Sequence, residues 1–167
     1  MNILDEEVFA VIIALTIIGS VIGVVQVLRP EITEPFVALS ILNQDCKLGD
    51  YPRIVYPGMN LTLCIYVYNH KPYPILAQVR YKIGDAKSLP SNTSPSFAQT
   101  IRIYQFVVNI ENNVTRKVSI PITITSSQNK NATLIFELWI FDVDKRDWVY
   151  TGIWNSLHVQ VVRAPIP

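Results

Sequence analysis

Residues 59–69 read MNLTLCIYVYN, and they decide the fold class because apolar and polar side chains alternate along them. In an extended chain Leu61, Leu63, Ile65 and Val67 fall on one side, and the residues between them fall on the other. A strand with one apolar face needs a second layer of structure to cover that face. The stretch therefore predicts a half-buried β-strand in a layered β-domain.

Six further stretches show a similar pattern between Pro, Gly and Asn turn signals. They are residues 36–42, 75–83, 97–110, 118–124, 132–143 and 156–162. Pro121 cannot donate to a strand ladder, so we expect residues 118–124 to form an edge strand. Seven strands separated by turns predict an all-β fold over residues 36–165, an antiparallel β-sandwich of the immunoglobulin-like kind.

An uncharged apolar run, VFAVIIALTIIGSVIGVVQVL, precedes this domain at residues 8–28. As a helix it would span about 31 Å, which matches a bilayer hydrocarbon core of about 30 Å. Asp5, Glu6 and Glu7 replace the basic lead of a signal peptide, and no cleavage site follows the run. We predict one transmembrane helix at residues 8–28, after a short segment at 1–7 and before a linker at 29–35.

Two signals bear on the side of the membrane that the domain occupies. Arg29 would favour a cytoplasmic position under the positive-inside rule. Four Asn-x-Ser/Thr sequons favour the outside, where N-glycans are added; they begin at Asn60, Asn92, Asn113 and Asn131. We predict a cell-membrane glycoprotein whose C-terminal domain is extracytoplasmic.

Cys46 and Cys64 are the two cysteines of the chain. An extracytoplasmic position would allow them to form one disulfide that closes a short loop. The alternative is a pair of buried free thiols.

Three segments resemble the archaeal DUF1616 family. Residues 36–42 followed by Gly49-Asp50-Tyr51-Pro52 are similar to its opening strand and loop, and Pro57-Gly58 before Tyr68-Asn69-His70 is similar to its next segment. Lys71 departs from that pattern, which has an acidic residue at this point. LIFELWIF at 134–141, followed by Leu157-His158-Val159, resembles its closing pair of strands. The resemblance implies the β-fold, an archaeal membrane setting and no catalytic residues.

The side chains that carry chemistry are sparse. A metal site requires at least three converging ligands, and His70, His158, Cys46 and Cys64 are the candidates. We expect the two histidines instead to be hydrogen-bonded residues of a turn and a strand end. The segment FDVDKRDW at 141–148 lacks the Gly and distal Glu of an EF-hand loop, so we expect a hairpin tip in which Asp and Lys/Arg charges compensate. With 14 basic and 13 acidic residues, the chain shows no nucleic-acid footprint. We expect a protein that is not an enzyme and uses no catalytic residues, cofactor, metal or small-molecule substrate.

The sequence supports contact surfaces better than it supports a catalytic or metal site. Small residues at four-residue spacing allow close approach of another helix, and they are Ala10, Ala14, Gly19 and Gly23. The alternative is a lipid-facing helix. Tyr66, Tyr68, Trp148 and Trp154 are candidate partner-contact aromatics, although packing against a second sheet would also explain them.

These patterns predict a non-catalytic, single-pass accessory or structural subunit of a cell-envelope membrane complex, and the DUF1616 resemblance implies that the complex is archaeal. Its partners would be the lipid bilayer and other integral-membrane subunits, which its helix would contact. The alternative is a pilin-like subunit of a surface filament that assembles through the same helix. A pilin signal is normally basic and cleaved just ahead of the apolar run, which the acidic lead of this chain does not match.

Overall fold

A computed structural model of the chain describes residues 6–28, 34–124 and 130–162. The chain divides into two compact units, Met1–Glu34 and Pro35–Pro167. The positions of the two units relative to each other are not determined, so each is described by itself. The predicted linker falls largely outside the described residues, and so do residues 1–5 and 163–165 of the predicted segments.

The first unit contains one α-helix, α1 (Glu6–Val27). It starts two residues before the predicted span and ends one residue before the end of that span. No proline interrupts the run until Pro30, which cannot continue a helix. α1 is long and apolar enough to cross a membrane.

The second unit is built almost entirely from β-strands. They are β1 (Val37–Leu42), β2 (Ile54–Val55), β3 (Asn60–Asn69), β4 (Ile75–Gly84), β5 (Thr100–Val108), β6 (Asn112–Pro121), β7 (Lys130–Asp142) and β8 (Asp147–Val161). A short 3-10 helix, η1 (Ala86–Ser88), follows β4 and is capped by the Asp85 side chain.

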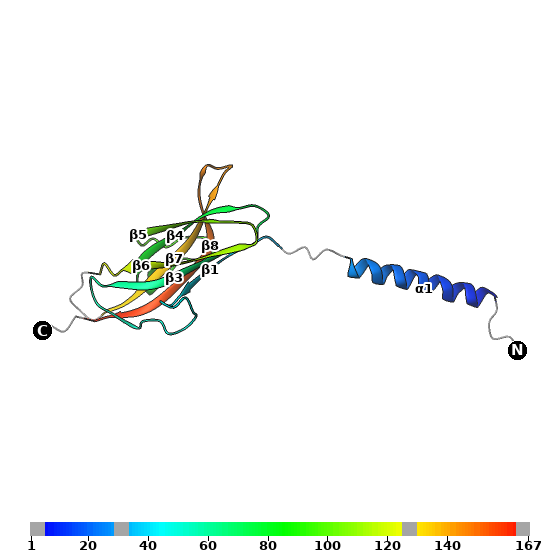
Figure 1. The fold of residues 1–167 in the computed structure, drawn as a ribbon, viewed down its shortest axis with the longest axis horizontal. Helices are drawn as coiled ribbons and strands as arrows, with labels where there is room; N and C mark the ends of the chain where they lie inside the picture. Colours follow the sequence, from blue (N-terminus) through cyan, green and yellow to red (C-terminus); the bar gives the residue numbers. More distant parts are fainter. Residues whose placement is uncertain (1–5, 29–33, 125–129, 163–167) are drawn as a thin grey trace. The chain divides into compact units, whose positions relative to one another are not determined.

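The strands form two sheets, and Figure 1 shows them stacked on each other. One sheet has the order β1-β3-β6, and the other has the order β2-β8-β7-β4-β5. Neighbouring strands are antiparallel except β2, which pairs in parallel with β8. The prediction of a mostly antiparallel, all-β domain after one apolar helix is confirmed.

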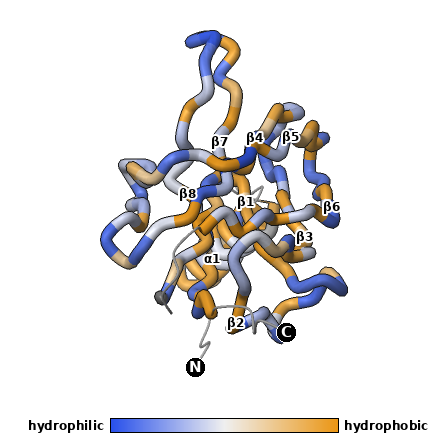
Figure 2. Tube along the Cα trace, turned by 90° about the vertical axis from the view of Figure 1, so that its left-hand side faces the viewer, coloured by the Kyte–Doolittle hydropathy of each residue, from blue (hydrophilic) through white to orange (hydrophobic). Residues whose placement is uncertain are grey.

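The core lies between the sheets and is supplied by both. In β3 the predicted inward residues Leu61, Leu63, Ile65 and Val67 are buried, while the residues between them, apart from Cys64, are more exposed. The facing sheet contributes the rings of Tyr81 and Phe136, whose centroids lie 5.2 Å apart. Figure 2 shows the resulting alternation of hydrophobic and hydrophilic residues along the strands.

Several strand boundaries differ from the prediction. β8 begins at Asp147, nine residues before the predicted start, and β6 begins at Asn112 instead of residue 118. The early part of β6 is polar because it forms an exposed edge, and the register of β8 shifts opposite β7 between Glu137 and Trp139. Neither segment therefore alternates regularly. β6 is an edge strand, as predicted, but it ends at Pro121 instead of residue 124.

We predict that Gly152→Ala destabilises the domain much more than Gly58→Ala. Both glycines have φ of +79°, so both variants carry the left-handed penalty of about 1–2 kcal/mol. A Cβ on Gly58 meets nothing within 4 Å, whereas a Cβ on Gly152 meets the backbone carbonyl of Asn92. Overpacking adds about 1–3 kcal/mol at Gly152. Urea unfolding followed by tryptophan fluorescence measures both; equal losses would contradict the prediction.

Candidate functional site

Helix α1 offers its surface to a partner or to lipid. Every residue from Val8 to Gln26 is exposed, and a Cβ added at Gly19 or Gly23 would meet nothing within 4 Å. At about 100° per residue, Thr16, Gly19, Ser20 and Gly23 share one side of the helix. The hydroxyl of Ser20 donates to the Ile17 carbonyl at 2.8 Å, and that of Thr16 donates to the Ile12 carbonyl. This side therefore has small side chains, and its two hydroxyls are already hydrogen-bonded to backbone carbonyls of the same helix.

Ala10 and Ala14 do not belong to that side. Nine residues separate Ala10 from Gly19 and also Ala14 from Gly23. Nine residues turn an α-helix through about 900°, which is half a turn beyond two full turns. The two alanines therefore lie about opposite the two glycines, so the helix has one glycine face and one alanine face.

The predicted contact aromatics lie on two different surfaces. Tyr66 and Tyr68 are half-buried on the outer face of the three-stranded sheet. The Tyr68 ring lies 5.8 Å from that of Phe36, and its hydroxyl lies 3.3 Å from Nδ1 of His70. Tyr68 thus packs with Phe36 and His70 on the outside of the sandwich, and neither Tyr66 nor Tyr68 belongs to the core between the sheets.

Trp148 and Trp154 belong to β8 in the five-stranded sheet, and both are half-buried. Trp148 packs edge-to-face on Phe141, with ring centroids 5.5 Å apart, at the base of the β7–β8 hairpin. Trp154 lies opposite Glu137 in the β7–β8 ladder. The structure therefore does not bring the four aromatics together into one patch.

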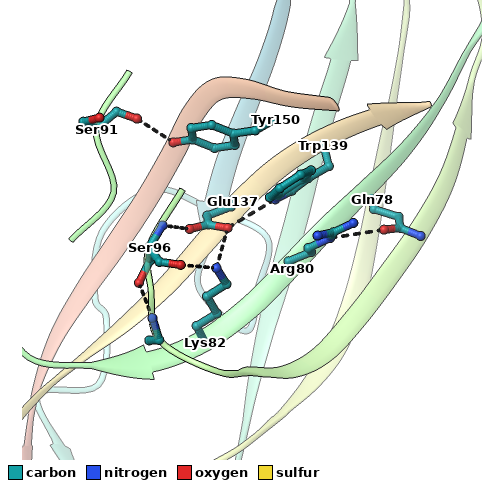
Figure 3. A network of polar contacts seen from close by, with 9 residues as sticks. Gln78, Arg80, Lys82, Ser91, Ser96, Glu137, Trp139 and Tyr150 are labelled. Atoms are coloured by element: carbon teal, nitrogen blue, oxygen red, sulfur yellow. Dashed lines mark hydrogen bonds and ion pairs between the residues drawn. The ribbon is translucent and has the colours of Figure 1, made fainter. Parts of the chain in front are cut away.

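A buried ion pair on the outer face of the five-stranded sheet was missed by the sequence reasoning (Figure 3). Nζ of Lys82 lies 3.0 Å from Oε2 of Glu137, and both side chains are almost fully buried. Lys82 also donates to the Ser96 carbonyl at 2.7 Å, and the Ser96 backbone N–H donates to Oε1 of Glu137 at 2.5 Å. The pair thus fastens the β4–β5 connection across the sheet.

Two aromatic residues extend this network along the same face. Nε1 of Trp139 donates to Glu137 at 3.2 Å, and the guanidinium of Arg80 stacks 3.7 Å from the Trp139 ring centre. Tyr150 packs on Trp139 and donates its hydroxyl to the Ser91 carbonyl at 2.8 Å. Burial, and then the negative charge of Glu137, raise the pKa of Tyr150 to about 12. The Tyr150 hydroxyl therefore stays protonated, as a donor, at physiological pH.

A sequence signal for this pair did exist. Glu137 is a single charge inside the apolar run LIFELWIF, whereas Lys82 follows Gln78 and Arg80 in the alternating pattern of β4 and does not stand out. A charge in such a run indicates a buried partner, because an unpaired buried charge is strongly unfavourable. Only the register, which places Glu137 opposite Arg80 and next to Lys82, identifies that partner.

The cysteines and sequons lie on the second unit. Cys46 and Cys64 form a disulfide across 18 residues of chain, which ties the β1–β2 connection to β3. The sequon asparagines Asn60, Asn92, Asn113 and Asn131 are all exposed. The structure therefore leaves each of them open to a modifying enzyme.

The histidines and the acidic hairpin form no cluster. His70 contacts Tyr68, whereas Nδ1 of His158 lies 3.0 Å from the Thr133 hydroxyl. Among the described residues, no three His, Cys, Asp or Glu side chains are grouped so that they could hold a metal ion. Asp142 accepts hydrogen bonds from the backbone N–H groups of Lys145 and Asp144, which lower its pKa. The hairpin is confirmed, and within it Lys145 forms an ion pair with Asp142 at 3.7 Å.

Comparisons with known proteins give the fold no functional assignment. No family model matches the chain, and no curated protein matches it. The chain is similar to the CARDB domain of the PF1109 protein from Pyrococcus furiosus, solved in complex with di-metal ions: 11% identity, 77% of this chain, 89% of that chain and a TM-score of 0.43.

Two larger proteins contain similar regions. A β-glucosidase from Listeria innocua matches 78% of this chain and 16% of its own length, at 7% identity and a TM-score of 0.48. The alpha-2-macroglobulin of Escherichia coli matches 78% and 17%, at 12% identity and a TM-score of 0.46. The chain spans only about a sixth of these two proteins, and likeness at this level carries no argument about activity.

We predict that Lys82 and Glu137 are strongly coupled. Lys82→Met or Glu137→Leu alone leaves one buried charge without its partner and should cost about 3–5 kcal/mol of unfolding free energy. The double variant should cost clearly less than the sum of the two single variants. Lys145→Met at the exposed Asp142–Lys145 pair is the control and should cost less than about 1 kcal/mol. Additive losses at Lys82 and Glu137, measured by urea unfolding, would refute the coupling.

Proposed function

We propose that this chain is a non-catalytic, single-pass membrane protein that serves as an accessory or structural subunit of an archaeal cell-envelope complex. The observation that supports the proposal best is the surface of α1, which is apolar and exposed over the whole of Val8–Gln26. Exposing such an apolar surface to water is unfavourable in free energy, so lipid and partner helices must cover it. The archaeal setting rests on the DUF1616 resemblance, which remains a prediction.

The glycine face of α1 gives the proposed partner contact a location. In a bilayer, hydrophobicity does not drive helices together, so close packing and hydrogen bonds decide which faces associate. Gly19 and Gly23 lack side chains that would hold a neighbouring backbone away. The alanine face is the natural comparison, because it has the same four-residue spacing on the other side of the same helix.

We further propose that the β-domain is an immunoglobulin-like sandwich on the extracytoplasmic side. Two observations support this position: four exposed sequon asparagines and a disulfide, which persists mainly in oxidising compartments. A domain of this kind would provide a rigid, protease-resistant cover over the outside of a complex.

We predict that Gly19→Leu combined with Gly23→Leu removes the partner subunits. Affinity purification of the full chain in mild detergent, followed by native mass spectrometry, measures their recovery. Leucine side chains would force the helices apart, so recovery should fall at least tenfold.

Ala10→Leu combined with Ala14→Leu is the matched control and should retain the partners. Unchanged recovery in the glycine variant would refute the helix-packing proposal. A wild-type chain that purifies alone, or that is sheared from cells as fibres, would refute the accessory-subunit proposal and favour the filament alternative.

We predict N-glycans on one or more of Asn60, Asn92, Asn113 and Asn131 in the native host. Glycopeptide mapping of the membrane fraction measures the occupancy of each, and Asn→Gln at an occupied site should abolish the corresponding glycopeptide. Bare asparagine at all four sites, in a host that glycosylates its other membrane proteins, would refute the extracytoplasmic position.

A further inference from the structure

One end of the sandwich, which we call the β1 end, collects four segments of chain. It comprises the start of β1, the β3–β4 connection, the β5–β6 turn and the β7–β8 hairpin, which projects beyond the other strands (Figure 1). Asn69 holds this end together, because its fully buried side chain donates to the carbonyls of Tyr73 and Asn109. The β1 end is therefore a defined surface with fixed connections between its loops.

Large apolar side chains are exposed at the β1 end. They are Phe36, Tyr73, Leu76, Val107, Ile110 and Val143. Between the β7–β8 hairpin and the β3–β4 connection lies an open groove of about 800 Å³, lined by residues that include Phe36, Tyr73, Leu76, Phe141 and Val143. Figure 2 shows hydrophobic residues on the β7 arm of the hairpin, below its hydrophilic tip. The surface is thus apolar with a polar rim.

Exposure alone does not single out this end, because Leu48 in the β1–β2 connection and Phe97 in the β4–β5 connection are also exposed. Covalent connection does. Seven residues lead from Leu28, just after α1, to Pro35, which lines the groove. A chain of seven residues spans about 25 Å at most. If α1 crosses a bilayer, Pro35 at the groove cannot lie farther than that from Leu28 at the end of the span.

We propose that the β1 end is a membrane-contact surface, in which Phe36, Tyr73 and Val143 enter the headgroup region of the bilayer that α1 spans. This inference rests on the proposed function only in requiring α1 to be inserted. Aromatic and aliphatic side chains at this depth exchange contact with water for contact with the acyl boundary. Tyrosine suits the position because its ring is apolar and its hydroxyl stays hydrated.

The charges at this end define the lipid chemistry. Lys71, Lys145 and Arg146 can extend apolar stems toward lipid phosphates, and the Lys71 ammonium lies 5.6 Å from the centre of the Tyr73 ring. Glu111, Asp142, Asp144 and Asp147 lie in the same loops and offset these basic groups. The contact should therefore depend on apolar insertion and be nearly independent of anionic lipid.

A weak intrinsic affinity is sufficient for this contact. A short tether gives the surface an effective concentration in the ~mM range at the bilayer. Two exposed sequons lie near this side of the domain. Asn113 lies opposite Tyr68 on the outer face of the three-stranded sheet, and Asn92 lies against Gly152 of β8. Neither belongs to the four segments that form the β1 end, so both are compatible with the contact.

The test measures the depth of single nitroxide labels in the full chain, reconstituted in phosphatidylcholine vesicles. Val143→Cys reports the β1 end, and Phe97→Cys is a matched control because the two side chains are 78% and 80% exposed. Ile17→Cys reports the helix itself. The ratio of collision with oxygen to collision with an aqueous nickel complex gives the depth of each label. Tryptophan fluorescence checks that every variant is folded.

We expect the ratio at residue 143 to exceed that at residue 97 at least threefold. It should be unchanged when a third of the lipid is phosphatidylglycerol, and Tyr73→Ser with Ile110→Ser should lower it toward the value at residue 97. Equal ratios at 143 and 97, with residue 17 in the hydrocarbon core, would overturn the membrane-contact surface alone. An aqueous residue 17 would instead overturn the membrane insertion on which the proposed function depends.

Discussion

The pairing of β4 with β7 fixes the rest of the sandwich, because its register decides which side chains face inward. It places Tyr81 and Phe136 between the sheets and leaves Lys82 and Glu137 on the outer face. If one of these strands slipped by one residue, its two faces would be exchanged, and its charge, Lys82 in β4 or Glu137 in β7, would enter the apolar core without its partner. The ion pair therefore does more than hold the β4–β5 connection: it makes the competing registers unfavourable, since a buried unpaired charge is far less tolerable than a misplaced methyl group.

Much of this architecture could be predicted from the sequence. β3 and β7 stand out because a face that packs against a second sheet imposes a regular apolar pattern. β2 and the first half of β8 could not be found in this way: β2 is two residues long, and the β8 segment loses its alternation where the register shifts around Gly152. The alternation of apolar and polar residues along a segment indicates which of its own side chains are buried. It does not report which distant segment completes a ladder, as the parallel pairing of β2 with β8 shows.

The candidate contact surfaces also divide into those that the local sequence pattern predicts and those that only the strand pairing reveals. The glycine face and the alanine face of α1 follow from helical periodicity alone, so the sequence suffices to separate them. The aromatics behave differently, because Tyr68 and Trp148 lie on different sheets and only the strand order reveals it. The Lys82–Glu137 pair has a signal in the sequence, but its pairing depends on the strand order. Glu137 is conspicuous in its apolar run, but Lys82 is not, and the 54 residues of chain between them hide the pairing.

Both proposed surfaces of this chain are weak by themselves, and the membrane is what would make them effective. A small-residue face on one helix gains little from association in three dimensions, but insertion confines both partners to a plane and aligns their axes. The apolar residues of the β1 end are too few to bind a vesicle tightly, yet a seven-residue connection would return them to the bilayer after each dissociation. Anchoring thus converts modest contacts into a defined orientation. A rigid β-domain held by two such contacts could scaffold a complex without any catalytic group.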